Sequence, residues 1–196
     1  MAPKLYITFV FCMFFSFLVL FNNGYAYGKG AKMVSIETSL GTIVVELDEE
    51  KAPDTVRNFI SYVQNGFYNG TIFHRVINDF MIQGGGFTSD MNQKKAGAPI
   101  KNEADNNLKN EKYSIAMART PDPHSASVQF FINVKDNDFL NYKEKTRSGW
   151  GYAVFGKVVK GTDVVDKIKA VPTRTLLGHT DVPVEPVLII SATVME

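Results

Sequence analysis

The sequence predicts a mainly β fold in which an antiparallel sheet closes on itself and helices cover its ends. Eight short runs are rich in β-branched and aromatic residues, and only two stretches show helical periodicity. The strands do not alternate with helices, so a parallel α/β sheet is not expected. The chain has 196 residues without repeats or low-complexity segments, which indicates one globular domain.

The first predicted elements are a hairpin and a helix. Runs 34–38 and 42–47 are β-rich and flank a short loop that contains Gly41, which predicts a β-hairpin. Pro53 is at a suitable first helical position, and Asn65-Gly66 ends the helical pattern. The apolar residues between them recur at the spacing of one helix face: Val56, Phe59, Ile60 and Val63.

The later elements are further strands and one short helix. Segment 162–170 predicts a helix that starts at Thr162, a residue able to act as an N-cap. Glycines 84–86 predict a bulge or tight turn. Segment 88–110 is polar and longer than a passive connector, so we expect it to shape a site. The other predicted strands are 72–76, 80–83, 114–118, 128–134, 152–159 and 187–194.

The first 26 residues differ from the remainder of the chain. Lys4 precedes the apolar run 5–21, and Gly24 and Ala26 are small residues before a possible cleavage site. We therefore expect a signal peptide over 1–26, a short linker over 27–32 and one domain over 33–196. The apolar run has 17 residues. That length lies between a usual signal-peptide core and a bilayer span, so an uncleaved membrane anchor is the alternative.

Charge and composition argue against several classes of function. The formal net charge is only +1, without a clustered basic stripe, so we expect no nucleic-acid partner. The single cysteine, Cys12, excludes an intramolecular disulfide and a thiolate metal cluster. No HExxH or GxSxG pattern is present, which argues against zinc-dependent and serine hydrolases. We expect no metal and no cofactor.

Three sequence blocks carry the candidate site. Segment 73–87 reads FHRVINDFMIQGGGF, segment 114–119 reads SIAMAR, and segment 127–133 reads SVQFFIN. Together with WGYAVFGKV at 150–158, they closely resemble the cyclophilin family of peptidyl-prolyl cis-trans isomerases, most of all its compact bacterial-type members. The resemblance runs from about Met33 to Glu196. It implies an eight-stranded antiparallel β-barrel capped by two α-helices, in agreement with the elements above.

The resemblance also implies a non-covalent mechanism. Rotation of an X-Pro bond sacrifices amide resonance, a barrier of about 20 kcal/mol, and gives the prolyl nitrogen a lone pair midway. A donor aimed at that nitrogen stabilises the twisted state selectively. By resemblance the catalytic donor is Arg75, for which a surface ion pair is the alternative. The matching substrate-binding positions are Phe80, Met81, Gln83, Ala118, Arg119, Thr120, Gln129, Phe131, Phe139, Leu140 and Tyr152.

Several of these positions carry finer expectations. Phe139 stands where eukaryotic cytosolic members have the tryptophan that contacts cyclosporin, so we expect weak cyclosporin binding, and Trp150 matches a different position. Tyr152 replaces their pocket histidine, with modest effects on substrate preference. By resemblance Arg119 acts mainly through its main chain. Gln83 and Gln129 match positions that bind peptide backbone or orient the arginine.

The function predicted from the sequence is an exported prolyl isomerase, most simply periplasmic, that acts on proline-containing polypeptides. A membrane-anchored domain outside the cytoplasm is the alternative location, with contact to the membrane only through the leader. We expect a monomer. The alternative function is a proline-peptide binding module or holdase chaperone with incidental turnover, but a mere binder has no need of a donor such as Arg75.

Overall fold

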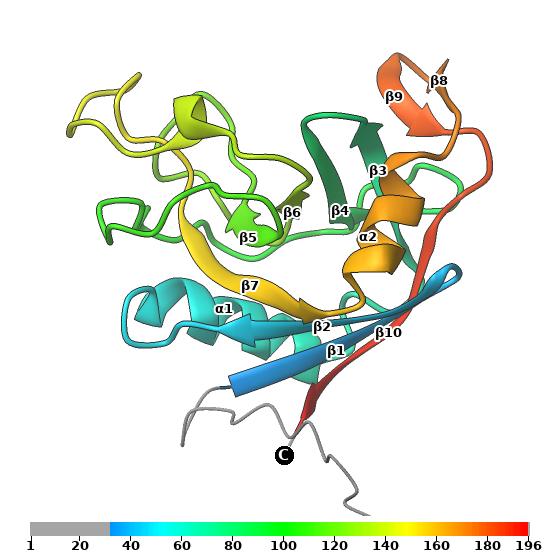
Figure 1. Cartoon of the computed structure of the whole chain (residues 1–196), viewed down its shortest axis with the longest axis horizontal. Helices are drawn as coiled ribbons and strands as arrows, with labels where there is room; N and C mark the ends of the chain where they lie inside the picture. The colour runs from blue at the N-terminus through cyan, green and yellow to red at the C-terminus, as the bar shows by residue number, and fades with distance from the viewer. Residues whose placement is uncertain (1–31, 196) are drawn as a thin grey trace, which may run out of the picture.

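The computed structural model describes residues 32–195 and contains a closed barrel of eight antiparallel strands (Figure 1). Around the barrel the order is β1-β10-β3-β4-β6-β5-β7-β2. The barrel strands are β1 (Lys32–Thr38), β2 (Gly41–Leu47), β3 (Thr71–Ile77), β4 (Met81–Thr88), β5 (Ser114–Met117), β6 (Phe130–Asn133), β7 (Val154–Lys160) and β10 (Leu188–Met195). This confirms the predicted fold class. The predicted leader, 1–26, lies outside the described residues, as does most of the linker.

Two helices complete the barrel, as the periodicity predicts. They are α1 (Pro53–Gln64) and α2 (Thr162–Lys169), and each buries its apolar face in the barrel core. Figure 1 shows them near opposite ends of β2 and β7. The predicted N-cap of α2 is wrong: Gly161 is the N-cap, with φ 84°, and Thr162 is the first helical residue. A Cβ at Gly161 would lie 2.2 Å from the Thr42 carbonyl oxygen, so the close turn out of β7 requires glycine.

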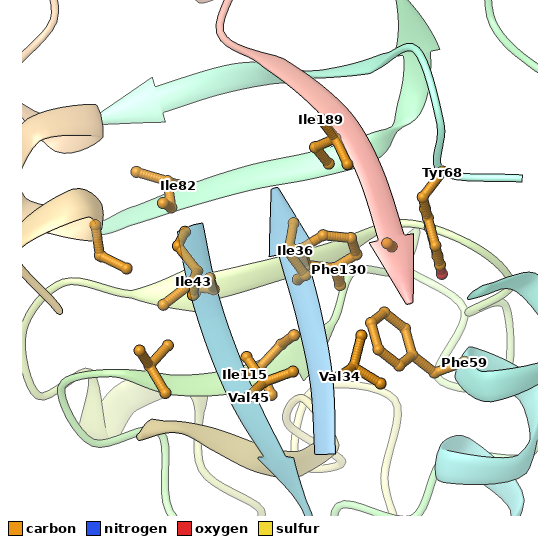
Figure 2. Close-up of a cluster of buried hydrophobic side chains, with 14 of the residues drawn as sticks. Val34, Ile36, Ile43, Val45, Phe59, Tyr68, Ile82, Ile115, Phe130 and Ile189 are labelled. Atoms are coloured by element: carbon orange, nitrogen blue, oxygen red, sulfur yellow. The ribbon is translucent and has the colours of Figure 1, made fainter. Parts of the chain in front are cut away.

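Side chains from the barrel strands and from both helices fill the barrel interior. Val34 and Ile36 of β1 and Ile43 and Val45 of β2 point into the same cluster as Phe59 of α1 (Figure 2). The Phe59 ring is the centre of an aromatic group, with centroids 5.1 to 5.6 Å away. Its ring partners are Tyr68, Phe130 and Phe155. This dense packing holds the outer faces of the strands in fixed positions.

Two features of the sheet bear on the site, a bulge that the sequence predicts and a hairpin that it does not. Strand β4 continues through glycines 84–86, where its register against β3 shifts, so these glycines form a bulge within a strand. Segment 173–183, for which no structure is predicted, forms a two-stranded hairpin of β8 (Thr173–Leu176) and β9 (His179–Pro183). Its side chains are mostly exposed and polar, so it lacks the apolar alternation that indicates a strand.

No helix within residues 32–195 is long and apolar enough to cross a membrane.

Candidate active site

A pocket of about 110 Å³ opens on the outer surface of the barrel, where β3, β4 and β6 lie side by side. A water molecule occupies about 30 Å³ in the liquid, so the pocket has room for a small ring. Its lining residues were all predicted as site residues from the sequence. They are Arg75, Phe80, Met81, Gln83, Ala118, Arg119, Phe131, Leu140 and Tyr152.

Strand alternation supplies the apolar floor of this pocket. On β6, Phe130 and Ile132 point into the barrel core, whereas Phe131 between them points outward. Phe131 packs with Met81 and Leu140 in a second, smaller cluster, and each of these three side chains is buried. Residues 130–132 of β6, with the sequence FFI, therefore form a continuous apolar run because both faces of the strand are covered.

Arg75 lies at the edge of this floor. It is on β3, paired in register with Gln83 of β4, and its side chain is 42% exposed. Its Nε lies 3.8 Å from Oδ2 of Asp181 on β9. Arg75 thus lines the apolar pocket and also forms the ion pair that was the alternative interpretation. Within residues 32–195 no hydrogen bond engages its guanidinium, so donors are available to a ligand in the pocket.

Two glutamines connect the pocket to the strands behind it. Gln83 Nε2 donates a hydrogen bond of 2.8 Å to Gln129 Oε1. The buried His74 ring lies close to Gln129, next to Arg75 on β3. Burial, together with the nearby charges of His179 and Arg75, lowers the pKa of His74 to about 4, so the ring is neutral at pH 7. Arg75 is therefore the cation of this strand.

The side chain of Arg119 is engaged in the walls of the site. Its Nε donates to the Gly151 carbonyl oxygen at 2.8 Å and its Nη1 to the Thr120 carbonyl oxygen at 2.9 Å. Its guanidinium carbon lies 4.5 Å from the centre of the Tyr152 ring. Thr120 lies beside the pocket in a turn, where its hydroxyl bonds Ser125. These contacts fix the wall and leave Arg75 as the less constrained guanidinium.

Phe139 projects from the rim of the pocket. It lies in the short 3-10 helix η1 (Asp138–Leu140), is 65% exposed, and stacks on Phe80 with ring centroids 5.6 Å apart. Trp150 is buried elsewhere, against His124 and Tyr142, and does not line the pocket. The indole of Trp150 therefore cannot stand in for the aromatic ring at the rim.

A buried asparagine network, which the sequence analysis missed, supports the rim. Asn137 Nδ2 donates to the Phe80 carbonyl oxygen at 2.8 Å and to Asn133 Oδ1 at 2.7 Å. Asn110 Nδ2 donates to the Leu140 carbonyl oxygen at 3.2 Å. The long loop that carries Asn110 thus shapes the site from behind. Asn110 and Asn137 lie in loops, where asparagine is common, so no linear signal distinguishes them.

A larger hollow of about 860 Å³ lies between the end of β2 and segment 108–114. Charged side chains of both signs line it, and it contains none of the predicted site residues. Among residues 32–195, no three His, Cys, Asp or Glu side chains lie close enough together to hold a metal ion. The small pocket beside Arg75 is therefore the better candidate for the active site.

Comparison with known proteins identifies the family. A family model described as cyclophilin type peptidyl-prolyl cis-trans isomerase/CLD matches residues 33–194. The chain belongs to the cyclophilin family. It is 64% identical to a peptidyl-prolyl cis-trans isomerase of Streptomyces antibioticus, over 83% of this chain and 98% of that cyclophilin. It is 59% identical to peptidyl-prolyl cis-trans isomerase B of Escherichia coli, over 84% of this chain and 100% of the other. Peptidyl-prolyl cis-trans isomerisation is therefore the activity of this cyclophilin.

Solved cyclophilin structures agree with the fold. The crystal structure of a cyclophilin type isomerase from Cryptosporidium parvum matches with a TM-score of 0.70 and 25% identity, covering 85% of this chain and 99% of that chain. A second structure of the same protein, in the presence of the dipeptide Ala-Pro, matches with a TM-score of 0.69. Both comparisons therefore support the barrel fold described above.

Proposed function

We propose that Arg75 carries the isomerisation by stabilising the twisted state of an X-Pro bond held in the pocket. The observation that carries the proposal is the position of its guanidinium at the edge of the apolar floor made by Met81, Phe131 and Leu140. A proline ring seated on that floor has its imide nitrogen near Arg75. Because an arginine is always charged and offers several donors, it can hold the carbonyl oxygen and meet the nitrogen lone pair as it forms.

The magnitude required is within reach of this arrangement. A thousandfold acceleration corresponds to about 4 kcal/mol of transition-state stabilisation. A hydrogen bond to a charged group contributes about 1.5–3 kcal/mol, and the buried floor excludes water from one side of the bond. The Gln83–Gln129 pair supports the proposal because it presents further polar groups beside the arginine, suited to a peptide backbone. No proton transfer and no covalent intermediate is needed.

The test compares wild type with Arg75→Ala and Arg75→Lys in a protease-coupled assay on an Ala-Pro peptide. We expect kcat/KM to fall at least a hundredfold in Arg75→Ala, with partial recovery in Arg75→Lys, because lysine keeps the charge and loses the planar donors. Peptide affinity, measured separately, should change much less. Full activity in Arg75→Ala overturns the role of Arg75. If wild type and Arg75→Ala bind the peptide equally and neither accelerates isomerisation, the result favours the binding-module alternative.

We further propose that the substrates are exported polypeptides in the periplasm. The support is the apolar run 5–21 after Lys4 and the small residues before position 27. The predicted remainder has no cysteine, which suits an oxidising compartment. Fractionation with N-terminal sequencing tests this: a periplasmic protein that starts near Tyr27 supports cleavage, an intact membrane-bound chain supports the anchor, and an intact cytoplasmic chain overturns export.

A further inference from the structure

The β8–β9 hairpin brings an acidic residue to the proposed catalytic arginine. In the hairpin, Arg174 pairs with Val182 and Leu176 pairs with His179, so β9 has one more residue than β8 between these two pairs. The irregularity is a β-bulge that includes Asp181. Bulges interrupt the alternation of a strand and can re-aim one side chain, often beside an active site.

The backbone of Asp181 is held in an uncommon conformation. Its φ is 61°, in the left-handed region that residues other than glycine rarely adopt and that aspartate and asparagine tolerate best. The carboxylate that results lies 3.8 Å from Arg75 Nε through Oδ2, and the same oxygen accepts a 3.1 Å hydrogen bond from the Thr180 hydroxyl. The bulge and the positive φ are both local deviations from regular strand geometry, and together they position the Asp181 carboxylate beside Arg75.

The hairpin is also fixed to the strand that carries the arginine. Val182 is buried against Ile72, Phe87 and Met91, and Leu176 packs on the same cluster. Ile72 is on β3, three residues before Arg75. Figure 1 shows the hairpin next to β3, at the side of the barrel away from β5 and β7. The carboxylate therefore has a rigid support, as a residue that orients another requires.

We propose that Asp181 is a positioning residue for Arg75. Its carboxylate meets the Nε side of the guanidinium and so keeps the terminal amines turned toward the pocket, where the X-Pro bond lies. This inference rests on the proposed role of Arg75. Both partners are near 40% exposed, so solvent screens the pair and its contribution is modest. We expect its loss to lower kcat about two- to fivefold, the range typical of exposed ion pairs.

The experiment uses Asp181→Asn, which keeps the side-chain volume and tolerates the left-handed backbone while it removes the charge. If Asp181 orients Arg75 in the transition state, kcat falls and KM changes little. The matched control is Glu185→Gln, which removes the same charge from an exposed position a few residues further along the chain. Thermal unfolding of both variants shows whether either change acts through stability.

A double-mutant cycle with Arg75→Ala separates this inference from the proposed function. Exchange NMR at high enzyme concentration measures the slow cis-trans isomerisation of the peptide that remains in the two variants that carry Arg75→Ala. We expect Asp181→Asn to have no effect in the Arg75→Ala background, because Asp181 acts through Arg75. An unchanged kcat in Asp181→Asn, an equal loss in Glu185→Gln, or an equal loss with and without Arg75 overturns the inference and leaves the role of Arg75 intact. Full activity of Arg75→Ala alone overturns both.

Discussion

Gly86 lies directly beneath the side chain of Gln129, the residue that holds Gln83 at the pocket. A Cβ on Gly86 would lie 2.6 Å from Gln129 Cγ and Nε2. The Gly86→Ala variant therefore has to push the flexible glutamine aside, which breaks its 2.8 Å hydrogen bond with Gln83. We expect kcat/KM to fall about twofold to tenfold, as loss of one hydrogen bond of about 0.5–1.5 kcal/mol implies, with little loss of stability.

The neighbouring Gly85 provides the contrast for this prediction. Its φ is 83°, and a Cβ there would lie 2.8 Å from the buried Tyr68 ring. Gly85→Ala should cost about 1–3 kcal/mol in unfolding free energy, because backbone strain and overpacking act together. Urea unfolding and kcat/KM are measured on both variants. If Gly86→Ala proves as destabilised as Gly85→Ala, its activity loss cannot be assigned to the glutamine pair.

Phe139 should limit the binding of cyclosporin. The ring is 65% exposed and stacks on Phe80, so a larger ring fits there without entering the core. Phe139→Trp adds an indole N–H donor at the rim, and one hydrogen bond corresponds to as much as about tenfold in affinity. We expect about tenfold tighter cyclosporin inhibition and little change in kcat/KM. Phe139→Leu is the control, and equal inhibition of all three proteins contradicts the prediction.

The residues of the pocket floor could be predicted because they lie in contiguous sequence blocks. Met81 and Gln83 follow Arg75 within one β-hairpin, and Phe131 lies on the strand paired with β4. Asp181 could not be predicted in the same way, since its position depends on a bulge and a positive φ that leave no linear pattern. Asn137 is similar: its role comes from a contact across 57 residues of chain.

At the level of elements, helix α1 depends on a residue from a distant loop. Its N-cap, Ala52, has no side chain that can accept a hydrogen bond. Instead the Glu103 carboxylate accepts bonds from the backbone N–H groups of Asp54 and Thr55, at 3.1 and 2.8 Å, and from the Thr55 hydroxyl at 2.7 Å. A negative charge at a helix N-terminus is also favoured by the helix dipole. The long polar loop is thus part of the scaffold of α1.

Glu103→Ala should therefore destabilise the protein without changing its catalysis. We expect the unfolding free energy to fall by about 1–2 kcal/mol, the usual cost of losing an N-terminal cap. Because Glu103 does not line the pocket, kcat/KM should stay at the wild-type value. Chemical denaturation checks the first point and the isomerase assay the second. The control is Glu50→Ala, at an exposed turn before the same helix, which should change neither the unfolding free energy nor kcat/KM. An equal loss of stability in this control argues against capping by Glu103.

The predicted elements agree with the structure wherever hydrophobic period decides. Helix α1 carries a full apolar face, and each of the eight barrel strands is a short β-rich run bounded by turns. The β8–β9 hairpin is different, because Leu176 and Val182 are its apolar contacts with the barrel and most of its other side chains are exposed or half-buried. Contact with β3 supports the pairing of β8 with β9. Strand prediction relies on the apolar alternation of half-buried strands, and this hairpin lacks that alternation.

For the whole molecule, closure of the barrel explains why the candidate active site lies on the outer surface and not inside the barrel. The interior is a packed core that includes Phe59, Phe130 and Phe155, so it cannot serve as a binding cavity. The site is instead built on the outer face of β3, β4 and β6, the face that alternation leaves outside. Because the inner faces of these strands pack in the core, the positions of Arg75 and the pocket floor are fixed.

Global stability should fall with acid through His74. The ring is 5% exposed, packs 4.6 Å from the Phe87 ring, and its Nδ1 has no hydrogen-bond partner within the described residues. The pKa of His74 is lowered from 6.5 to about 4, chiefly by burial. Between pH 6.5 and pH 4 the ring is therefore protonated in the unfolded chain and neutral in the folded chain. The stabilising contribution is complete above pH 6.5 and is lost progressively down to pH 4, by up to about 3 kcal/mol.

Urea unfolding of wild type and His74→Phe at a series of pH values from 8 to 4 measures this effect. Phenylalanine keeps a ring against Phe87 and does not titrate, so the variant should lose its contact with Gln129 at every pH but lack the slope between pH 6.5 and 4. The free energies of the two proteins should therefore converge as the pH falls. Parallel curves across that window would show that the folded protein protonates His74 as easily as the unfolded chain does, and that the acid sensitivity of the barrel lies in other groups.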